Sequence, residues 1–302
     1  MKTVKAWVSA ARLRTLPLSI SGIVVGAALA TAKGAFDVTT FWLAILTTIA
    51  FQVTSNFAND YGDGIKGTDA NDRIGPMRAL QSGNLTKNQL FRGILLSISV
   101  SVLLTVAVVI QAFGMQQLKL LILFLLFGGF SIWAAIKYTM GDTPYGYQGL
   151  GDVFVFLFFG LLGVMGTTFL FTKHLEVLDV FPAIGVGLLC VGVLNLNNLR
   201  DMESDKRHGK RTLVVKMGFA AGKKYHYCLL GFSAVSFIVY AIGTAKDIWD
   251  ASYLIAFTPI LWHLATVVKT NDPRLLDKEL KKLALSTFFL ALTFYITLNY
   301  FL

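Results

Sequence analysis

Long uncharged stretches alternate along the chain with segments rich in polar residues. About 20 helical residues cross the roughly 30 Å hydrocarbon core of a bilayer, and nine apolar runs approach or exceed that length. Spanning helices satisfy their own backbone hydrogen bonds, as hydrocarbon requires. The pattern therefore predicts an all-α, polytopic membrane protein. The predicted spans are residues 16–32, 38–59, 92–113, 117–137, 149–171, 177–199, 225–244, 247–268 and 281–301.

Composition and charge support this prediction and orient it. The chain is 55% hydrophobic and 15% charged, whereas soluble domains are about a quarter charged. If the N-terminus lies in the cytoplasm, only Lys33, Lys119, Lys173 and Lys246 of the 27 basic residues fall on the opposite side. Cytoplasmic loops of membrane proteins carry such an excess of Lys and Arg. The net charge of +10 is thus explained without a nucleic-acid partner.

The polar segments suggest one integral membrane domain, residues 1–302, with two long cytoplasmic loops. These loops, about 60–91 and 200–224, follow the second and sixth predicted spans. Each preceding span ends in an Asn-xxx-Asp pentapeptide, 56–60 and 197–201, and the two Asn and the two Asp are separated by the same interval. Repeated units place functional sites between them in many membrane proteins. The repetition indicates that both loops do the same job.

Four side chains at the end of the second span share a helical face. At about 100° per residue, Asn56, Asn59, Asp60 and Asp63 fall within an arc of about 100°. The helix is therefore expected to continue through Asp63, with Gly64 and Gly67 turning the chain. Asp69 would reach the same place only from the loop. In the second segment, side chains with oxygen donors share a face in the same way. They are Asn197, Asn198, Asp201 and Asp205.

Converging carboxylates need compensation, because two like charges about 4 Å apart cost on the order of 4 kcal/mol at an effective dielectric constant near 20. A set of donors that are all oxygen favours hard ions such as Mg²⁺. Oxygen atoms of a substrate phosphate commonly complete the coordination shell of this ion. Basic residues that could meet a phosphate follow both clusters: Lys66, Arg73, Arg78, Lys210 and Arg211. One cluster alone would fit a charged helix end in a solvated loop. Two Asn-led clusters with neighbouring bases favour Mg²⁺ and a polyanion.

Four segments resemble the UbiA superfamily of intramembrane aromatic prenyltransferases. They are RLRTLP (12–17), NDYGDGIKGTDANDRIGPMRALQSG (59–83), YTMGDTPYGYQGLGDVFVFLFFG (138–160) and NLNNLRDMESDKRHGKRTLVVKMG (195–218). The strings NDYGD…KGTD…DRIGP and PYGYxGLGD resemble the branch that acts on 1,4-dihydroxy-2-naphthoate. In the general pattern an Asp follows the first Asn at the place that Gly67 holds here, and Asp69 lies two residues further on.

The resemblance implies a nine-helix UbiA-type bundle in the bacterial inner membrane, with its site facing the cytoplasm. It implies transfer of a polyprenyl group from polyprenyl diphosphate to 1,4-dihydroxy-2-naphthoate, with decarboxylation, to give demethylmenaquinol. The implied Mg²⁺ ligands are Asn59, Asp60, Asp63, Asp69, Asp201 and Asp205, supported by Asn56, Asn197 and Asn198. The five basic residues named above would neutralise the diphosphate.

Three further residues are candidates for handling the acceptor. Tyr138 and Asp152 would orient the naphthoate or accept its proton, and Arg12 would meet its carboxylate. Two alternatives remain open. One is a related enzyme for another aromatic acceptor, such as 4-hydroxybenzoate or homogentisate. The other is a cation-coupled transporter, which would use acids near a repeat interface.

Overall fold

The computed structural model describes residues 2–67, 74, 75 and 77–300, and the regular elements among them are all helical. Nine helices in this part of the chain are long and apolar enough to cross a membrane, which is the predicted number. In chain order the elements are α1 (Lys2–Ala11), η1 (Leu13–Thr15), α2 (Leu16–Ala32), α3 (Val38–Lys66), α4 (Lys87–Phe113), α5 (Leu118–Lys137), η2 (Tyr145–Gln148), α6 (Gly151–Val155), η3 (Phe156–Gly166), α7 (Thr167–Thr172), η4 (Val177–Asp179), α8 (Val180–Arg207), α9 (Leu213–Met217), α10 (Phe219–Thr244), η5 (Trp249–Phe257), α11 (Thr258–Lys269), η6 (Pro273–Leu275) and α12 (Leu276–Tyr300).

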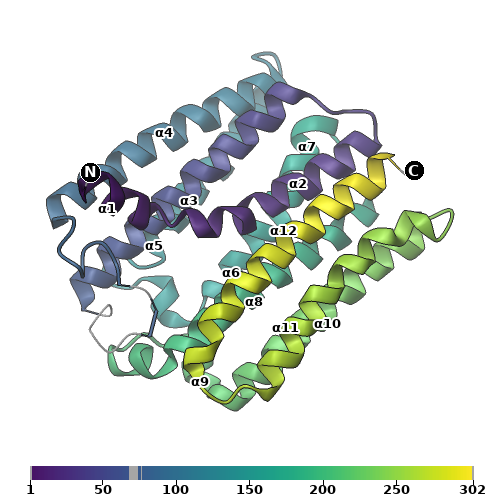
Figure 1. The fold of residues 1–302 in the computed structure, drawn as a ribbon. Coiled ribbons are helices and arrows are strands. Elements are labelled where there is room, and N and C mark those ends of the chain that lie inside the picture. Colours follow the sequence, from purple (N-terminus) through teal and green to yellow (C-terminus); the bar gives the residue numbers. More distant parts are fainter. Residues whose placement is uncertain (1, 68–73, 76, 301–302) are drawn as a thin grey trace.

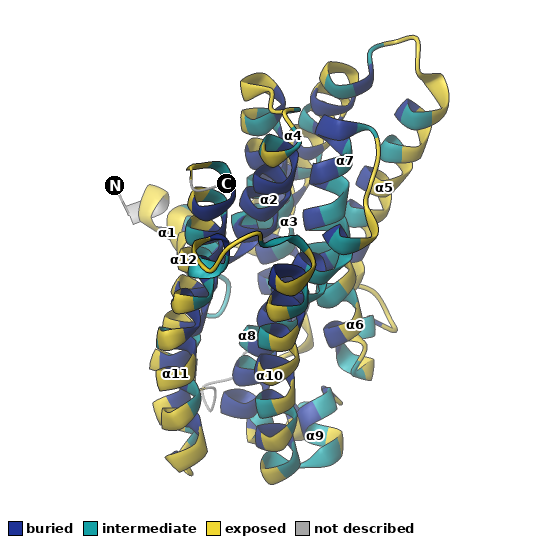
Figure 2. Cartoon of the chain, turned by 90° about the vertical axis from the view of Figure 1, so that its right-hand side faces the viewer, coloured by how far each residue is buried: buried dark blue, intermediate teal, exposed yellow. Residues whose placement is uncertain are grey.

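The helices form a bundle in which α2, α8 and α12 lie between two outer groups (Figure 1). The α3–α4 pair lies on one side and the α10–α11 pair on the other. Helix α2 is apolar all round, and most of its residues are buried, as expected of a central helix. On α10 and α11 the exposed residues face outward (Figure 2), and they include Ile242 and Trp262. An apolar outer surface of this kind suits a lipid environment.

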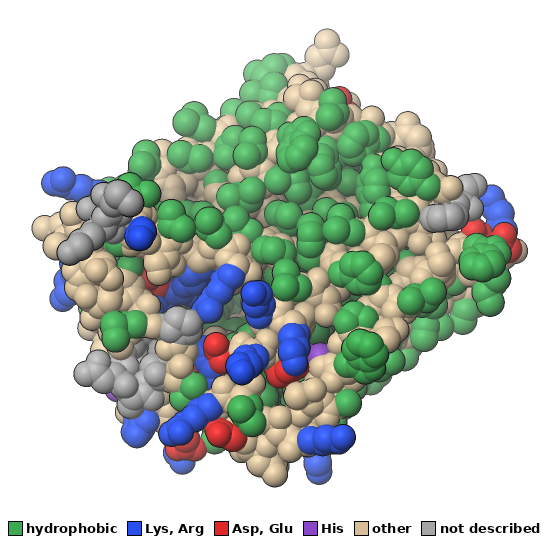
Figure 3. Space-filling model, viewed as in Figure 1, with side chains coloured by type: hydrophobic (Ala, Val, Ile, Leu, Met, Phe, Trp, Pro, Cys, Tyr) green, Lys and Arg blue, Asp and Glu red, His purple; other side chains and the backbone are tan. Residues whose placement is uncertain are grey.

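Charged side chains gather at one end of the bundle, where α3 and α8 finish and α12 begins (Figure 3). We call this the acidic end, after Asp60 and Asp63 of α3 and Asp201 and Asp205 of α8. In the view of Figure 3, hydrophobic side chains cover much of the remaining surface. The separation matches a helical membrane protein whose polar groups collect at a membrane surface.

Helix α3 carries its acidic residues within its last turns, as the angular argument predicts. The helix is capped at its start by Asp37, whose side chain accepts a 2.7 Å hydrogen bond from the Thr40 amide. It ends at Gly67, which adopts a left-handed φ of 73°. The predicted turn at Gly64 is wrong. Gly64 remains helical, and the Leu80 side chain packs against it, 2.5 Å from where a Cβ would lie.

The fifth span contains an 11-residue π-helical segment, η3, which the sequence pattern does not predict. Its glycines let neighbouring helices approach closely. A Cβ on Gly160 would lie 2.6 Å from Gly187 Cα on α8, and one on Gly22 of α2 would lie 2.8 Å from Phe159 O. π-helical turns are rare and are often found at functional sites. Here the segment forms part of the wall of the cavity described next.

Candidate active site

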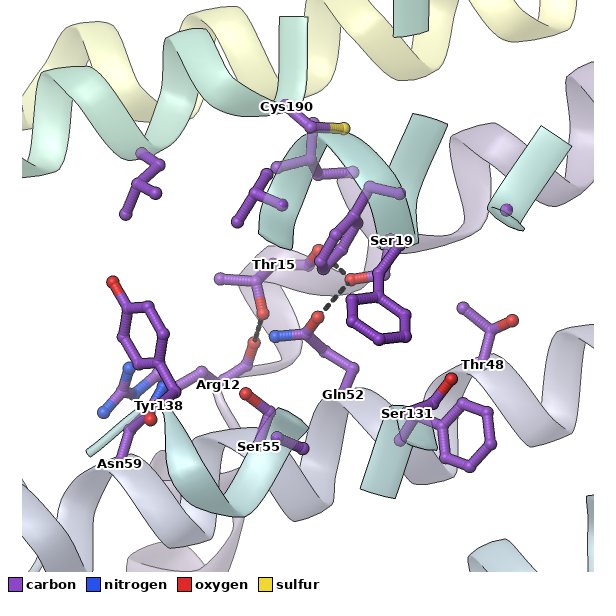
Figure 4. Close-up of a pocket in the computed structure, with 18 of the residues that line it drawn as sticks. Arg12, Thr15, Ser19, Thr48, Gln52, Ser55, Asn59, Ser131, Tyr138 and Cys190 are labelled. Atoms are coloured by element: carbon purple, nitrogen blue, oxygen red, sulfur yellow. Dashed lines mark hydrogen bonds between the residues drawn. The ribbon is translucent and has the colours of Figure 1, made fainter. Parts of the chain in front are cut away.

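A cavity of about 740 Å³ lies inside the bundle and reaches the acidic end. Its lining along α3 extends from Ala44 to Asp63, a length of about 28 Å at about 1.5 Å per residue. Charged and amide side chains line the acidic end of the cavity. The rest is mainly apolar and includes Ile23, Val108, Val109, Phe124, Phe127, Phe158, Phe159, Leu162 and Leu170. Figure 4 shows part of this lining, with Arg12, Asn59 and Tyr138 at one side. The shape fits a ligand with an anionic head and a long apolar tail.

Asp60 faces two arginines that come from different parts of the chain. A carboxylate oxygen, Oδ1, accepts hydrogen bonds from Arg12 Nη2 and, at 3.1 Å, from Arg78 Nη1. The other oxygen, Oδ2, accepts from the Ala79 amide at 3.4 Å. Asp60 is buried, with 1% of its surface exposed. Asp60 therefore binds two arginines and a backbone amide, although the sequence predicts that it is a metal ligand.

Asp63, one helical turn further on, has a different set of partners. Its Oδ1 accepts a 2.8 Å hydrogen bond from the Tyr147 hydroxyl. Its Oδ2 lies 3.2 Å from Arg78 Nη2 and 3.7 Å from Lys210 Nζ. The ammonium groups of Lys66 and Lys210 lie 5.3 Å and 5.4 Å from the centre of the Tyr147 ring. Asp63 thus stands at the centre of the basic groups and lines the cavity.

The second cluster, on α8, is compensated by a cation of its own helix. Arg200 donates to Asp201 through Nε at 2.9 Å and through Nη2 at 2.6 Å. The same guanidinium donates to Asn197 Oδ1 at 2.8 Å and to Asp277 Oδ1 at 2.5 Å. Arg200, Asn197 and Asp277 line the cavity, and Arg200 is only 2% exposed. Asp205 is buried one turn beyond Asp201.

Tyr138 shows that the two clusters converge. Burial, followed by the charges of Asp63, Asp152 and Asp205, raises the pKa of the Tyr138 hydroxyl well above its usual value. Asp63 lies on α3 and Asp205 on α8, so the negative charges of both clusters act on the Tyr138 hydroxyl. Tyr138 lines the cavity and stays protonated at neutral pH. It is therefore a hydrogen-bond donor toward the cavity.

Asp152 lies beside Tyr138 but is not among the described residues that line the cavity. The neighbouring Gly151 is close to the Tyr138 ring, because a Cβ there would lie 3.3 Å from the Tyr138 hydroxyl oxygen. The Tyr225 hydroxyl of α10 lies near the Asp152 carboxylate. Oδ2 of Asp152 is buried and has no hydrogen-bond partner among the described residues. A buried acceptor without a partner lowers the stability of the fold, and a catalytic role is one explanation for keeping it.

Several predicted residues are not among the described residues that line the cavity, and they include Asp201 and Asp205 of α8. Lys66 is exposed and donates to Gly141 O at 2.7 Å. Arg211 is also exposed, and its backbone amide donates to Tyr147 O at 3.0 Å. Asn198 is buried on α8. Asn56 donates to Ala11 O, as discussed below. Asp69 and Arg73 lie outside the described residues.

The donor set of the site fits a hard divalent cation. Asn59, Asp63, Asp201 and Asp205 offer oxygen atoms only, as Mg²⁺ prefers. Among the described residues, the protein alone does not assemble three acidic, His or Cys side chains in a metal-binding arrangement. Mg²⁺ usually takes one or two carboxylates and completes its shell with water and substrate phosphate. The residues therefore fit an ion that is held together with a phosphate ligand.

Three residues of the site were not predicted from the sequence: Arg200 and Asp277, which line the cavity, and Tyr147, which donates to Asp63. Arg200 was hidden because a basic residue beside an acid on a helix is ordinarily a solvated surface residue. Tyr147 lies in PYGYQGLGD (144–152), a segment singled out only for its resemblance. Away from the cavity, His226 and His263 form a 3.0 Å Nε2–Nε2 contact, and His263 Nδ1 lies 2.7 Å from Glu279 Oε2. Their positions in separate helices gave no signal in the sequence.

Fold and site together define an intramembrane protein with a binding site for an anionic amphiphile. The chain belongs to the UbiA prenyltransferase family, whose model matches residues 19–293. It is 41% identical over 269 residues to the 1,4-dihydroxy-2-naphthoate octaprenyltransferase of Escherichia coli (strain K12), covering 89% of this chain and 87% of that protein. It is 40% identical over 294 residues to the protein of the same name from Haemophilus influenzae, covering 96% and 94%.

Solved structures support the fold. A UbiA homolog from Archaeoglobus fulgidus, bound to GPP and Mg²⁺, has a TM-score of 0.70 and 13% sequence identity, covering 97% of this chain and 99% of that chain. The apo structure of a UbiA homolog from Aeropyrum pernix K1 has a TM-score of 0.72 and 12% identity, covering 93% and 97%. The predicted nine-helix UbiA-type bundle is therefore confirmed.

Proposed function

We propose that this protein transfers a polyprenyl group from polyprenyl diphosphate to 1,4-dihydroxy-2-naphthoate, with loss of carbon dioxide, to give demethylmenaquinol. The cavity carries this proposal, because basic and acidic groups line one end and the rest of its wall, within a total length of about 28 Å along α3, is mainly apolar. A diphosphate fits the first part and a prenyl chain the second. Two relatives at 40% identity or more are named as octaprenyltransferases for this naphthoate.

Side chains at the acidic end of the bundle would hold Mg²⁺ against the diphosphate. We assign this role to Asn59 and Asp63 on α3 and to Asp201 and Asp205 on α8, with Asn197 and Asn198 as supporting groups. Asp69 remains a candidate from the loop. When bound, Mg²⁺ would neutralise the charge that develops on the leaving diphosphate. The homolog from Archaeoglobus fulgidus that shares this fold is bound to GPP and Mg²⁺.

Basic side chains would stabilise the same leaving group. Arg78 and Lys210 are the best placed, because both line the cavity and both lie within 4 Å of Asp63. Lys66 and Arg211 lie further out, and Arg73 is a candidate from the loop. Fixed positive groups in a site that excludes water stabilise developing negative charge strongly. The bond from the prenyl carbon to the diphosphate oxygen breaks, and its electron pair leaves with the oxygen.

The acceptor would be held at the same acidic end, by Arg12 and Tyr138. Arg12 would pair with the naphthoate carboxylate, and the Tyr138 hydroxyl would donate a hydrogen bond to the ring oxygens. The ring carbon that bears the carboxylate attacks the prenyl carbon and forms the new carbon–carbon bond. Carbon dioxide then leaves, and the electron pair of the broken bond restores the aromatic ring. Asp152 is the candidate for accepting a proton from a hydroxyl of the acceptor.

The protein would lie in a bacterial inner membrane with its N-terminus and its acidic end in the cytoplasm. The distribution of basic residues supports this orientation. Both substrates then reach the site where they are available. The naphthoate would come from the aqueous side and the prenyl diphosphate from the bilayer.

Transfer to a panel of acceptors tests the proposal. Purified protein in lipid nanodiscs is given labelled polyprenyl diphosphate, Mg²⁺ and, in turn, 1,4-dihydroxy-2-naphthoate, 4-hydroxybenzoate or homogentisate. We expect a prenylated, decarboxylated product with the naphthoate alone. Product from another acceptor only would assign a sister reaction. Cation flux in proteoliposomes without any prenyl transfer would overturn the enzyme in favour of a transporter.

A further inference from the structure

A row of polar residues on α3 faces the N-terminal segment. Gln52, Asn56 and Asp60 are spaced by four and therefore stack along one side of the helix. Ser19 Oγ donates to Gln52 Oε1 at 2.7 Å, and Gln52 Nε2 donates to Asn56 Oδ1 at 3.2 Å. Asn56 Nδ2 in turn donates to Ala11 O at 2.9 Å. Figure 4 shows the Ser19–Gln52 bond beside Arg12.

This hydrogen-bonded row meets the chain where its backbone is strained. Arg12 adopts a left-handed conformation, with φ 51° and ψ 54°, at the break between α1 and η1. Residues other than glycine rarely adopt it, and they do so mostly where surrounding contacts enforce it. The Thr15 amide and hydroxyl both donate to Arg12 O at 2.9 Å, and Asn56 holds the carbonyl of the preceding residue. The strained turn carries the Arg12 side chain to the cavity wall.

Asp60, the last member of the row, binds the Arg12 guanidinium. Asp60 Oδ1 accepts from Arg12 and from Arg78, and its Oδ2 accepts from the Ala79 amide. Both arginines line the cavity. A planar guanidinium recognises carboxylate or phosphate well only when its orientation is fixed. Asp60 fixes that orientation for two of them.

We propose that Gln52, Asn56 and Asp60 form an arginine-positioning row, and that only Asn59 and Asp63 of this motif serve the metal. Arg12 would be set for the acceptor carboxylate and Arg78 for the diphosphate. The inference rests on the proposed function for the identity of these two anions. The division of labour within the motif rests on the contacts alone. Asp60 is then a positioning residue.

Measurements of metal affinity and of acceptor KM distinguish the positioning role of Asp60 from the metal-binding role of Asp63. Mn²⁺ replaces Mg²⁺, and its affinity is followed by electron paramagnetic resonance with a prenyl thiodiphosphate that does not react. We expect Asp60→Asn to leave the Mn²⁺ dissociation constant within about twofold of the parent and to raise the KM for the naphthoate at least tenfold. We expect Asp63→Asn to raise the Mn²⁺ dissociation constant at least tenfold. The control is Asp247→Asn, in the exposed connection after α10, which should change neither quantity.

An Mn²⁺ affinity that falls as far in Asp60→Asn as in Asp63→Asn would overturn the proposal. Asn56→Ala tests the row itself and should raise the acceptor KM about threefold to tenfold with Mn²⁺ binding intact. An unchanged KM in Asn56→Ala would also overturn it. If Asp60→Asn does not fold, Arg12→Lys addresses the same contact from its other partner and should show the same pattern. If the parent protein transferred nothing to the naphthoate, the proposed function would fail, whereas the Mn²⁺ comparison would still decide the role of Asp60.

Discussion

The acidic segments of α3 and α8 look like two copies of one motif, but their charges are balanced in different ways. When Asn56 is aligned with Asn197, Asp60 aligns with Asp201, and Arg200 takes the place of Asn59. Helix α8 therefore carries its own cation, and Arg200 grips Asp201 through two hydrogen bonds. Helix α3 has no basic residue at that place and receives Arg12, Arg78 and Lys210 from elsewhere in the chain.

The difference separates a cluster that is set locally from one that is set by the whole fold. Asp201 can be oriented as soon as α8 forms, because its partner is the adjacent residue. Asp60 and Asp63 are oriented only when α1, the segment after Gly67 and the segment after α8 have all packed against α3. Perturbations of the α3 cluster should therefore act mainly on catalysis, and perturbations of Arg200 mainly on stability.

The largest effect is expected at Asp63. Asp63→Asn removes the charge that faces Arg78 and Lys210 and a candidate metal ligand. Removing one preorganised electrostatic group from an active site costs about 10²–10³ in rate, and loss of the metal adds to this. We expect at least about a 10³-fold loss of prenyl transfer in nanodiscs, measured at a temperature where thermal unfolding shows the variant to be folded. A loss below tenfold would remove Asp63 from the centre of the site.

Arg200 should show the opposite signature. Arg200→Met leaves the Asp201 carboxylate buried without its guanidinium, and breaking a buried pair costs about 3–5 kcal/mol. We expect about 3 kcal/mol, because Asp277 is 39% exposed and can be rehydrated. Thermal unfolding in detergent measures the loss. The double variant Arg200→Met/Asp201→Asn should recover part of it, and a double variant no more stable than the single one would argue against the pairing.

Tyr147 tests how the α3 cluster is held. Tyr147→Phe removes the hydroxyl that donates to Asp63 and keeps the ring between Lys66 and Lys210. Hydrogen bonds to charged groups contribute about 1.5–3 kcal/mol, so we expect the rate of transfer to fall about tenfold. Single-turnover rates provide the measurement. A variant with the parent rate would show that Asp63 does not need this donor.

Tyr138 connects the two clusters and makes a prediction about pH. Burial and the neighbouring carboxylates raise its pKa above the usual value of about 10, so the hydroxyl stays protonated between about pH 6 and pH 9. Tyr138→Phe should lower kcat/KM by no more than about tenfold, and the factor should be the same across that pH range. If the parent profile showed a limb between these values that vanished in Tyr138→Phe, Tyr138 would titrate there and the assignment as a donor would be wrong.

The smallest effect is expected at Lys66. Its ammonium binds Gly141 O, and it is exposed at the rim of the site. Exposed charges are screened and contribute little, so Lys66→Ala should reduce transfer by no more than about threefold. Lys210→Ala, the matched change at the buried lysine beside Asp63, should reduce it about a hundredfold. Equal effects would mean that both lysines reach the diphosphate.

Much of the fold could be predicted from the sequence because hydrophobic periodicity and length are local properties. The nine spans are confirmed in the part of the chain that the structure describes, and so is the continuation of the second span as a helix through Asp63. The π-helical segment η3 escaped, because an apolar run such as FLFFGLLGVMG fits an α-helix equally well. The helical state of Gly64 was not predicted, because glycine is compatible with a turn as well as with a helix.

The composition of the site was predictable, but the partner of each acid was not. A shared helical face follows from residue spacing, so Asn56, Asn59, Asp60 and Asp63 could be grouped. The spacing does not say that Arg12 binds Asp60 rather than Asp63, because that choice depends on the left-handed turn at Arg12. Likewise, Arg200 and Asp277 meet only when α8 and α12 pack together.

A structure of the protein in a lipid nanodisc with Mn²⁺ and a prenyl thiodiphosphate tests the central claim most directly. We predict that the diphosphate and Mn²⁺ lie between Asn59 and Asp63 of α3 and Asp205 of α8, with the prenyl chain in the apolar part of the cavity. Asp60 should still hold Arg12 and Arg78. A diphosphate bound away from Asp63, or Mn²⁺ coordinated by Asp60, would contradict the account.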